Sequence, residues 1–290
     1  MAPAQSAVAP QPPGIAPAPR EFDFSDADFR ALAKLAYDYA GITLPDAKKN
    51  LVYGRLSRRL RTLGLMTFED YRNYLTDNAD REMQLFINAL STNHTKFFRE
   101  QHHFDHFLSE VIAPFNEHHA SGGRLRVWSA GCSSGEEPHT IALLLQAEVK
   151  NIAGRDVPIL ATDIDTDVLR RAALGVFSAE AATSVPAKYR KLLSQPAGDD
   201  TVSIDRKVCG LIAFGHLNLM NDWPVRGPFD AIFCRNVMIY FDQPTKARLV
   251  ERFTDLLRVG GWLYIGHSES LIGSHPRLKL SGRTIYRRTV

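Results

Sequence analysis

Apolar side chains between residues 26 and 90 recur every three or four positions, which predicts a run of amphipathic helices. The first helix is expected to start at Ser25, where Asp28 completes a capping box, and to end at Gly41. We expect these helices to pack into a small all-α module. A second helix is predicted at about residues 46–63 and a fourth at about residues 81–90. Between them, a third helix is predicted to start at a cap formed by Thr67 and Asp70.

From about residue 124 the pattern changes to short apolar runs separated by helix-length segments. Such runs predict a mainly parallel sheet with helices on both faces, and therefore an α/β fold. A helix that ends at Gly260 and Gly261 is expected to lead into the last of these strands. Residues 182–214 are less regular, and we expect two short antiparallel strands, 201–204 and 211–214, on an insertion. The main strands are predicted at residues 125–129, 158–162, 229–234 and 262–266.

The composition limits the class of protein. The 290 residues suggest about two domains, and 44% hydrophobic with 23% charged residues is ordinary for a globular chain. Residues 1–20 are mostly Ala, Pro, Gln and Ser, so we expect a disordered tail there. The chain has no apolar run of membrane-spanning length and no secretory signal pattern, and its three cysteines are widely spaced. A reducing, cytoplasmic location is the simplest expectation.

The second predicted helix is unusually basic. Residues 45–63 contain six basic residues and one acidic residue, a local charge of +5 in a chain of +3. One interpretation is a solvated face, and the other is a docking surface for an acidic partner, either nucleic acid or a protein helix. The basic residues are Lys48, Lys49, Arg55, Arg58, Arg59 and Arg61.

Residues 127–138 carry the clearest ligand signal. The strand leads into a loop of small residues between Gly131 and Gly135, and Pro138 suits the first turn of the following helix. This arrangement lets a ligand approach the backbone, although a purely structural turn remains an alternative. Glu136 and Glu137 would repel a pyrophosphate. A ligand with positive charge, such as S-adenosylmethionine, is therefore favoured over a dinucleotide.

Further polar side chains are expected at the carboxyl ends of the sheet strands, where ligands bind in open α/β folds. Asp163 follows the second strand and could accept the hydroxyls of a ribose, whereas Asp165 could be a helix cap, and the two roles are easily confused. Arg235, Asn236 and Tyr240 follow the third strand. The alternatives for the last two are a loop cap and a half-buried core aromatic.

Three neighbouring histidines, His102, His103 and His106, suggest a metal site at first sight. They lie on a helix with an apolar stripe, and the sequence lacks the glutamate of a His-Glu-x-x-His motif. We expect no metal.

Five motifs occur in an order that resembles the chemotaxis receptor methyltransferases of the CheR family, over about residues 22–290. The first reads Thr-Asn-His-Thr-Lys-Phe-Phe-Arg-Glu at residues 92–100, and the second is Ser-Ser-Gly-Glu-Glu-Pro at 133–138. Thr-Asp-Ile-Asp at 162–165 is the third. The last two are Cys-Arg-Asn-Val-Met-Ile-Tyr-Phe-Asp at 234–242 and Gly-His-Ser-Glu at 266–269.

The resemblance implies an S-adenosylmethionine-dependent protein-glutamate O-methyltransferase that acts on cytoplasmic chemoreceptor helices. It also implies an all-α N-terminal domain at residues 21–95 and a Rossmann-like methyltransferase domain at 96–290, with a β subdomain inserted at about 182–214. A cytoplasmic monomer with S-adenosylhomocysteine as product, no metal, no nucleic-acid partner and no membrane insertion is expected.

The resemblance also assigns residues. Arg99 and Tyr240 match positions near the transferred methyl group. With glutamate-rich helices as partners, the basic helix becomes the predicted receptor-binding surface, through Arg55, Arg58, Arg59 and Arg61. The cofactor-binding positions that match are Asn93, Thr95, Arg99, Glu137, Asp163, Asn218, Leu219, Arg235 and Asn236.

One stretch departs from the pattern. Members that hold a receptor's C-terminal peptide have a glycine-bracketed loop in the β subdomain, whereas residues 195–201 here contain one glycine. This favours a tether-independent enzyme. The competing functions are a nucleic-acid methyltransferase, which a pI of 8.7 permits, and a non-catalytic scaffold that binds S-adenosylmethionine. The usual Asp/Asn-Pro-Pro-aromatic motif of amino-group methylases is absent at residues 235–238.

Overall fold

The computed structural model describes residues 20–118, 122–195, 200–269, 271 and 275–290. The expected disorder of residues 1–20 falls almost entirely outside this part, as does most of the departing stretch, at 196–199. Within the described residues, no helix combines the length and the apolarity that a bilayer crossing requires.

The N-terminal helices form a module with its own core, as the apolar spacing predicted. Ser25 and Asp28 make the expected capping box, Gly41 ends the first helix in the left-handed conformation, and Thr67 accepts a hydrogen bond from the Asp70 amide. The core packs Leu32, Leu56 and neighbouring apolar side chains. The elements are α1 (Asp26–Ala40), η1 (Asp46–Lys48), α2 (Lys49–Leu63), α3 (Phe68–Asp77) and α4 (Ala79–Leu90).

A seven-stranded sheet forms the second domain, with strand order β6-β2-β1-β7-β8-β10-β9. The first five strands in this order are parallel, and β10 and β9 add antiparallel strands at one edge. The predicted mainly parallel sheet is therefore confirmed. The strands are β1 (Val127–Ala130), β2 (Ile159–Asp163), β6 (Ile212–His216), β7 (Phe229–Cys234), β8 (Leu257–Ile265), β9 (Leu278–Gly282) and β10 (Ile285–Arg288).

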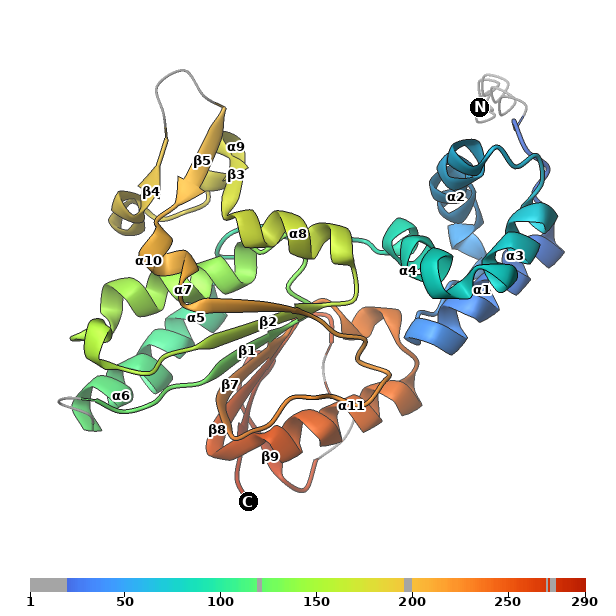
Figure 1. Ribbon diagram of the computed structural model, residues 1–290. Helices are drawn as coiled ribbons and strands as arrows, with labels where there is room; N and C mark the ends of the chain where they lie inside the picture. Colours follow the sequence, from blue (N-terminus) through green and yellow to red (C-terminus); the bar gives the residue numbers. More distant parts are fainter. Residues whose placement is uncertain (1–19, 119–121, 196–199, 270, 272–274) are drawn as a thin grey trace, which may run out of the picture.

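Alternate residues of the central strands pack on opposite faces of the sheet. Val127 and Phe233 join the core with α5, η2 and α7, whereas Trp128 and Ile232 join the core with α11. Figure 1 shows the helical module and the small second sheet at opposite ends of the view. The helices of this domain are α5 (Gln101–Phe107), η2 (Leu108–Ile112), α6 (Ala113–His118), α7 (Glu136–Glu148), η3 (Ile152–Gly154), α8 (Thr166–Leu174), η5 (Met238–Tyr240) and α11 (Gln243–Leu256).

The small sheet differs from the sequence expectation. Residues 201–204 form a strand of it, but residues 211–214 were wrongly expected there: Leu211 directly precedes β6, and Ile212 to Phe214 are its first residues, in parallel pairing with β2 of the main sheet. Leu211 accepts a hydrogen bond from the Ile159 amide, which starts this pairing. The subdomain comprises β3 (Val176–Ser178), α9 (Ala179–Ala182), η4 (Ala187–Leu192), β4 (Leu193–Ser194), β5 (Thr201–Ile204) and α10 (Arg206–Cys209).

The paired glycines before the last parallel strand were also misplaced. α11 ends at Leu256, and β8 starts at Leu257, so Gly260 and Gly261 lie inside the strand. The β7–β8 register shifts at this point. A Cβ on Gly261 would lie 2.9 Å from the Arg258 carbonyl oxygen and 3.1 Å from that of Phe229. These glycines therefore permit an irregularity in the strand where the backbone is crowded, and they do not end a helix.

Candidate functional site

A cavity lies at the carboxyl ends of β1, β2 and β7, between the sheet and the helical module. Its walls come from the loops after these strands, from the linker at residues 91–96, and from Ala40 and Ile42 of the module. The structure brings all the predicted cofactor and catalytic residues to this one cavity. They are Asn93, Thr95, Arg99, Glu137, Asp163, Asn218, Leu219, Arg235, Asn236 and Tyr240.

The loop after β1 approaches the cavity closely with its backbone. Gly131 has a φ of +85°, and a Cβ there would lie 2.3 Å from a methyl carbon of Val237. Only glycine fits this conformation and this space. The Ser133 amide donates a 2.7 Å hydrogen bond to Asp163 Oδ2, so the loop is fixed against the neighbouring strand.

Asp163 and Asp165 now have separate roles. Asp163 is the last residue of β2, lines the cavity and accepts hydrogen bonds from the Ser133 and Asp165 amides. Burial raises the pKa of Asp163, and these amides oppose the shift. Asp165 instead caps α8, because its side chain accepts from the Asp167 and Val168 amides. The ambiguity that the sequence left open is resolved in favour of Asp163 as the cavity carboxylate.

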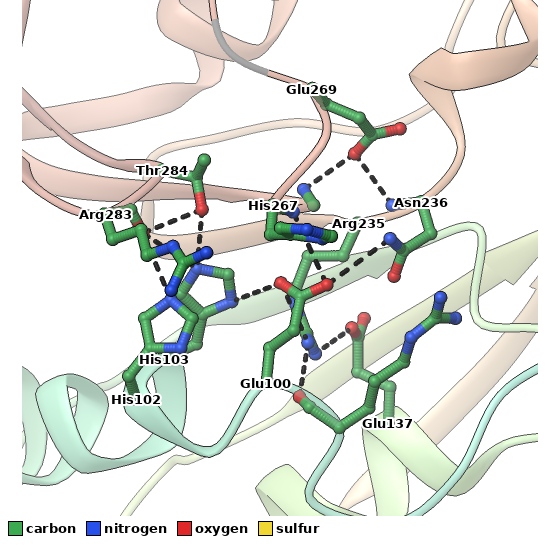
Figure 2. A network of polar contacts seen from close by, with 12 residues as sticks. Glu100, His102, His103, Glu137, Arg235, Asn236, His267, Glu269, Arg283 and Thr284 are labelled. Atoms are coloured by element: carbon green, nitrogen blue, oxygen red, sulfur yellow. Dashed lines mark hydrogen bonds and ion pairs between the residues drawn. The ribbon is translucent and has the colours of Figure 1, made fainter. Parts of the chain in front are cut away.

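A buried cation, Arg235, joins two carboxylates at the end of β7. Its Nη1 donates to Glu137 Oε2 at 2.9 Å, and its Nη2 lies 3.5 Å from Glu100 Oε2 and donates to the Arg99 carbonyl (Figure 2). Burial raises the pKa of Glu137, although Arg235 and a hydrogen bond from the Ser129 hydroxyl oppose it. Arg235 thus links two segments: the turn that contains Arg99 and the first turn of α7, which contains Glu137.

Asn236 follows Arg235 in the left-handed conformation, at a φ of +59°. The carboxylate of Glu269 holds this turn: one oxygen accepts hydrogen bonds at 2.7 Å from the amides of Gly266 and Asn236, the latter labelled in Figure 2. Its other oxygen accepts from the Ile239 amide at 2.9 Å. Sequence reasoning placed Glu269 in a motif but gave it no role. Its signal was that motif alone: the Gly266 amide lies within the motif, but the amides of Asn236 and Ile239 lie thirty or more residues away in the sequence.

The two predicted catalytic residues line the cavity from different sides. Arg99 donates from Nη1 to the His94 carbonyl at 2.8 Å, within the same segment of chain. The hydroxyl of Tyr240 donates to the Thr92 carbonyl at 3.4 Å, and the Lys48 ammonium lies 5.2 Å from the centre of its ring. Lys48 belongs to the helical module, so the module reaches the tyrosine.

Three predicted cofactor residues already have partners within the chain. Asn93 donates to Asp165 Oδ2 at 2.7 Å, which ties the linker to the start of α8. Asn218 donates to the Tyr39 carbonyl of the module at 2.7 Å. The Trp223 indole donates to the Leu219 carbonyl at 3.2 Å. These contacts set the shape of the cavity, and the roles toward a cofactor stay predictions.

The predicted receptor-binding arginines lie on α2, do not themselves line the cavity, and differ from one another in their partners. Arg59 makes a bidentate ion pair with Glu82, a residue that is 2% exposed. Arg61 pairs with Glu21 at 2.6 Å in an exposed position. Arg55 donates to carbonyls at the end of α4. Arg58 is exposed, and its guanidinium has no ion-pair partner among the described residues.

Glu100, His102 and His103 offer a group of three ligand atoms within 4.8 Å of one another. Burial and the nearby Arg235 lower the pKa of His103 to about 3, so this imidazole is neutral at pH 7. Arg235 is also a fixed positive charge beside Glu100, which disfavours a second cation there. His106 lies apart from the group, at 3.0 Å from the Tyr264 hydroxyl. The absence of a metal stays an expectation.

Comparison with known families matches both parts of the chain. Residues 93–287 match the CheR methyltransferase SAM binding domain, and residues 27–91 match the CheR methyltransferase all-alpha domain. The chain belongs to the CheR methyltransferase family. The resemblance that the sequence motifs indicated is therefore confirmed, together with the predicted combination of an all-α domain and an S-adenosylmethionine-binding α/β domain.

Relatives in this family are similar over nearly their whole length. A probable chemotaxis protein methyltransferase of Rhizobium etli is 43% identical over 263 residues, which cover 88% of this chain and 97% of that protein. The chemotaxis protein methyltransferase of Escherichia coli is 43% identical over 269 residues, 90% of this chain and 91% of its own. Chemotaxis protein methyltransferase 2 of Pseudomonas aeruginosa is 41% identical over 273 residues, 92% and 95% of the two chains.

The cavity of this CheR family member fits S-adenosylmethionine. Asp163 presents a carboxylate at the end of β2, where ribose hydroxyls are bound in related dinucleotide folds. The Gly131 backbone permits close approach, and Leu217, Leu219 and Phe241 supply apolar wall. Glu137 also lines the cavity, with its carboxylate paired to the Arg235 guanidinium.

Proposed function

We propose that this chain transfers the methyl group of S-adenosylmethionine to glutamate side chains of chemoreceptor helices, which forms glutamate methyl esters. The observation that carries the proposal is the gathering of Asp163, Arg99 and Tyr240 around one cavity that also meets the all-α module. Membership of the CheR family supports a methyltransferase of chemotaxis, and the glutamate specificity is the finer step that we propose.

When bound, S-adenosylmethionine supplies a methyl group made electrophilic by the sulfonium. A glutamate carboxylate, with a pKa of about 4.3, is already ionised at pH 7, so the chain needs no general base. Among the cavity residues, Arg99 and Tyr240 are suited to orient the carboxylate, Tyr240 by a neutral hydrogen bond that leaves its charge free. The apolar wall excludes water, which favours a reaction that neutralises opposite charges.

The helical module is suited to hold an acidic helix beside the cavity. Lys48 lies over the Tyr240 ring at the cavity, and Arg58 is exposed on α2. The exposed pair of Arg61 with Glu21 is weak, so Arg61 remains available to a partner. Arg59 is committed to Glu82 and is left out of the docking surface that we propose, which consists of Lys48, Arg58 and Arg61.

The test is methylation by the purified chain with labelled S-adenosylmethionine and, separately, a receptor cytoplasmic fragment, RNA and DNA. We expect label in the receptor fragment alone, released by mild base as a methyl ester. The matched control is the same fragment with its methylated glutamates changed to alanine, which should remain unlabelled. Label in nucleic acid, or base-stable label in protein, contradicts the proposal. If the chain binds the cofactor but methylates none of the three substrates, the result would contradict the proposal and favour a non-catalytic scaffold.

A further inference from the structure

The linker between α4 and α5 forms one wall of the cavity. Residues 91–96 have no helical or strand structure, yet Ser91, Thr92, Asn93 and their neighbours line the cavity. Because no regular backbone ladder holds this segment, its position depends on individual contacts. The middle of the linker is tied to the catalytic domain: Asn93 donates to Asp165, and the Ser133 hydroxyl donates to the Asn93 carbonyl at 3.1 Å.

The first half of the linker is held from α2 by Arg55. Its Nη1 donates to the carbonyl oxygens of Leu90 at 2.5 Å and of Ser91 at 2.9 Å. Its Nη2 donates to the Thr92 hydroxyl at 3.1 Å. The last carbonyls of a helix have no partner inside the helix, and a cation is favourable at that end. Arg55 thus caps α4 and forms hydrogen bonds to three consecutive residues that lead into the cavity.

The segment that Arg55 holds, residues 90–92, contacts the predicted catalytic residue Tyr240 through Thr92. Its side chain accepts from Arg55, and its carbonyl accepts from the Tyr240 hydroxyl at 3.4 Å. Movement of Thr92 would therefore move both the linker wall and a hydrogen-bond partner of Tyr240. A site that acts by positioning loses rate when its groups move by about 1 Å.

We propose that Arg55 is a positioning residue that fixes the cavity wall through residues 90–92, rather than a cation that docks the receptor. The inference rests on the proposed function, since it assigns Arg55 to the same methyl-transfer site. It divides α2 by role: Arg55 faces the linker, whereas Arg58, one helical turn further, is exposed for a partner.

Replacement of Arg55 by lysine distinguishes a positioning role from a docking role. A docking cation acts through its charge, which lysine retains. Arg55 instead places two nitrogens of a planar guanidinium on three acceptors, and a single ammonium cannot reproduce that fork. Arg55→Lys therefore keeps the charge of α2 and removes this set of hydrogen bonds. Arg81→Lys, at an exposed position on α4, is the matched control.

For Arg55→Lys we expect the methylation rate at saturating receptor to fall at least tenfold, with the receptor KM and its salt dependence within twofold of wild type. Hydrogen exchange of the Ser91 amide, which donates to the Ile87 carbonyl at 2.9 Å, should accelerate at least tenfold in the free protein. Arg81→Lys should change neither quantity. Arg58→Ala should do the opposite of Arg55→Lys, raising the receptor KM at an unchanged saturated rate.

Wild-type rate and wild-type exchange in Arg55→Lys would overturn the proposal, as would an effect of Arg55→Ala confined to the receptor KM. Thr92→Val provides a second test, because it removes the hydroxyl that accepts from Arg55 and leaves α2 intact. Its effect should not add to that of Arg55→Lys. Exchange is measured without substrate, so a failure of the glutamate assignment would leave this readout intact and distinguishable.

Discussion

The helical module and the catalytic domain hold their charged groups in different ways. In the module, opposite charges meet across long sequence distances, as in the pair of Arg59 with Glu82. In the catalytic domain Glu137 pairs with Arg235, but the buried carboxylates of Asp163 and Glu269 are held mainly by backbone amides of tight turns. The module's paired charges therefore serve its own fold, whereas an amide-held carboxylate retains acceptor capacity and negative charge for a ligand.

The same contrast bears on the basic helix α2. The +5 of residues 45–63 left a solvated face and a docking surface open, and Arg55 and Arg59 are both bonded to groups inside the chain, so their receptor role stays a prediction. A local excess of charge shows how many cations a helix carries, not how many are free. The comparison predicts that losing the buried Arg59–Glu82 pair of the module lowers stability, while losing the Asp163 carboxylate at the cavity weakens ligand binding.

The largest expected effect is on the module. Arg59→Ala leaves the Glu82 carboxylate buried with only the Tyr71 hydroxyl at 3.0 Å as a side-chain donor, because both oxygens lose Arg59. Breaking a buried pair in this way should lower the free energy of unfolding by about 3 kcal/mol. Urea unfolding followed by far-ultraviolet circular dichroism, which reports on the helices, measures it.

The control for this prediction is Arg61→Ala on the same helix. Its pair with Glu21 is exposed to solvent, so its loss should destabilise the module far less than loss of the buried Arg59–Glu82 pair. Equal destabilisation by the two variants would contradict the distinction between buried and exposed pairs in the module.

Local sequence signals predicted much of the fold. The caps of α1 and α3 depend on residues three positions apart, and the parallel strands follow from short apolar runs. The cavity residues could also be located, because the carboxyl ends of adjacent parallel strands share one edge of a sheet. That rule predicts from the sequence that Asp163 and Arg235 lie near each other, and both line the cavity.

What the sequence did not reveal depends on contacts distant along the chain. The partner of Arg59 is 23 residues away, and the amides that hold Glu269 include one 33 residues away. The sheet that receives residues 212–216 is likewise decided by pairing with β2, about fifty residues earlier in the chain. No local pattern encodes these choices, so an apolar run predicts a strand but not the sheet that it joins.

The second prediction is at the cavity. Asp163→Ala should weaken S-adenosylhomocysteine binding by about 1–3 kcal/mol, the range for losing a charged hydrogen-bond partner from a buried site. Calorimetric titration of the folded variant measures the change. Asp167→Ala removes an exposed carboxylate four residues later that does not line the cavity, and it should leave the affinity within twofold. Unchanged affinity in Asp163→Ala would remove this residue from the ribose role.

The smallest effect concerns buried histidines of the catalytic domain. Burial lowers the pKa of His139 to about 4, from an ordinary value of 6.5. This residue lies next to the loop that follows β1: its Nδ1 is 2.8 Å from the Gly135 carbonyl, and its Nε2 is 3.9 Å from Cys209 Sγ. Between pH 6.5 and about 4, the unfolded state binds a proton that the native state does not bind. Stability contributed by the neutral imidazole is therefore present above pH 6.5 and lost as the pH falls.

From pH 7.5 to 5.5 this loss amounts to about 1.4 kcal/mol for His139. Buried carboxyl groups act in the opposite direction, because burial raises the pKa of Asp163 and Glu269, so the measurement compares variants over the same interval. We expect His139→Gln to reduce the drop in unfolding free energy by about 1.4 kcal/mol. Tryptophan fluorescence isolates the catalytic domain, since Trp128, Trp223 and Trp262 all lie there. An identical drop in wild type and variant would show that His139 is protonated equally in both states, and would confine the pH sensitivity of this domain to other groups.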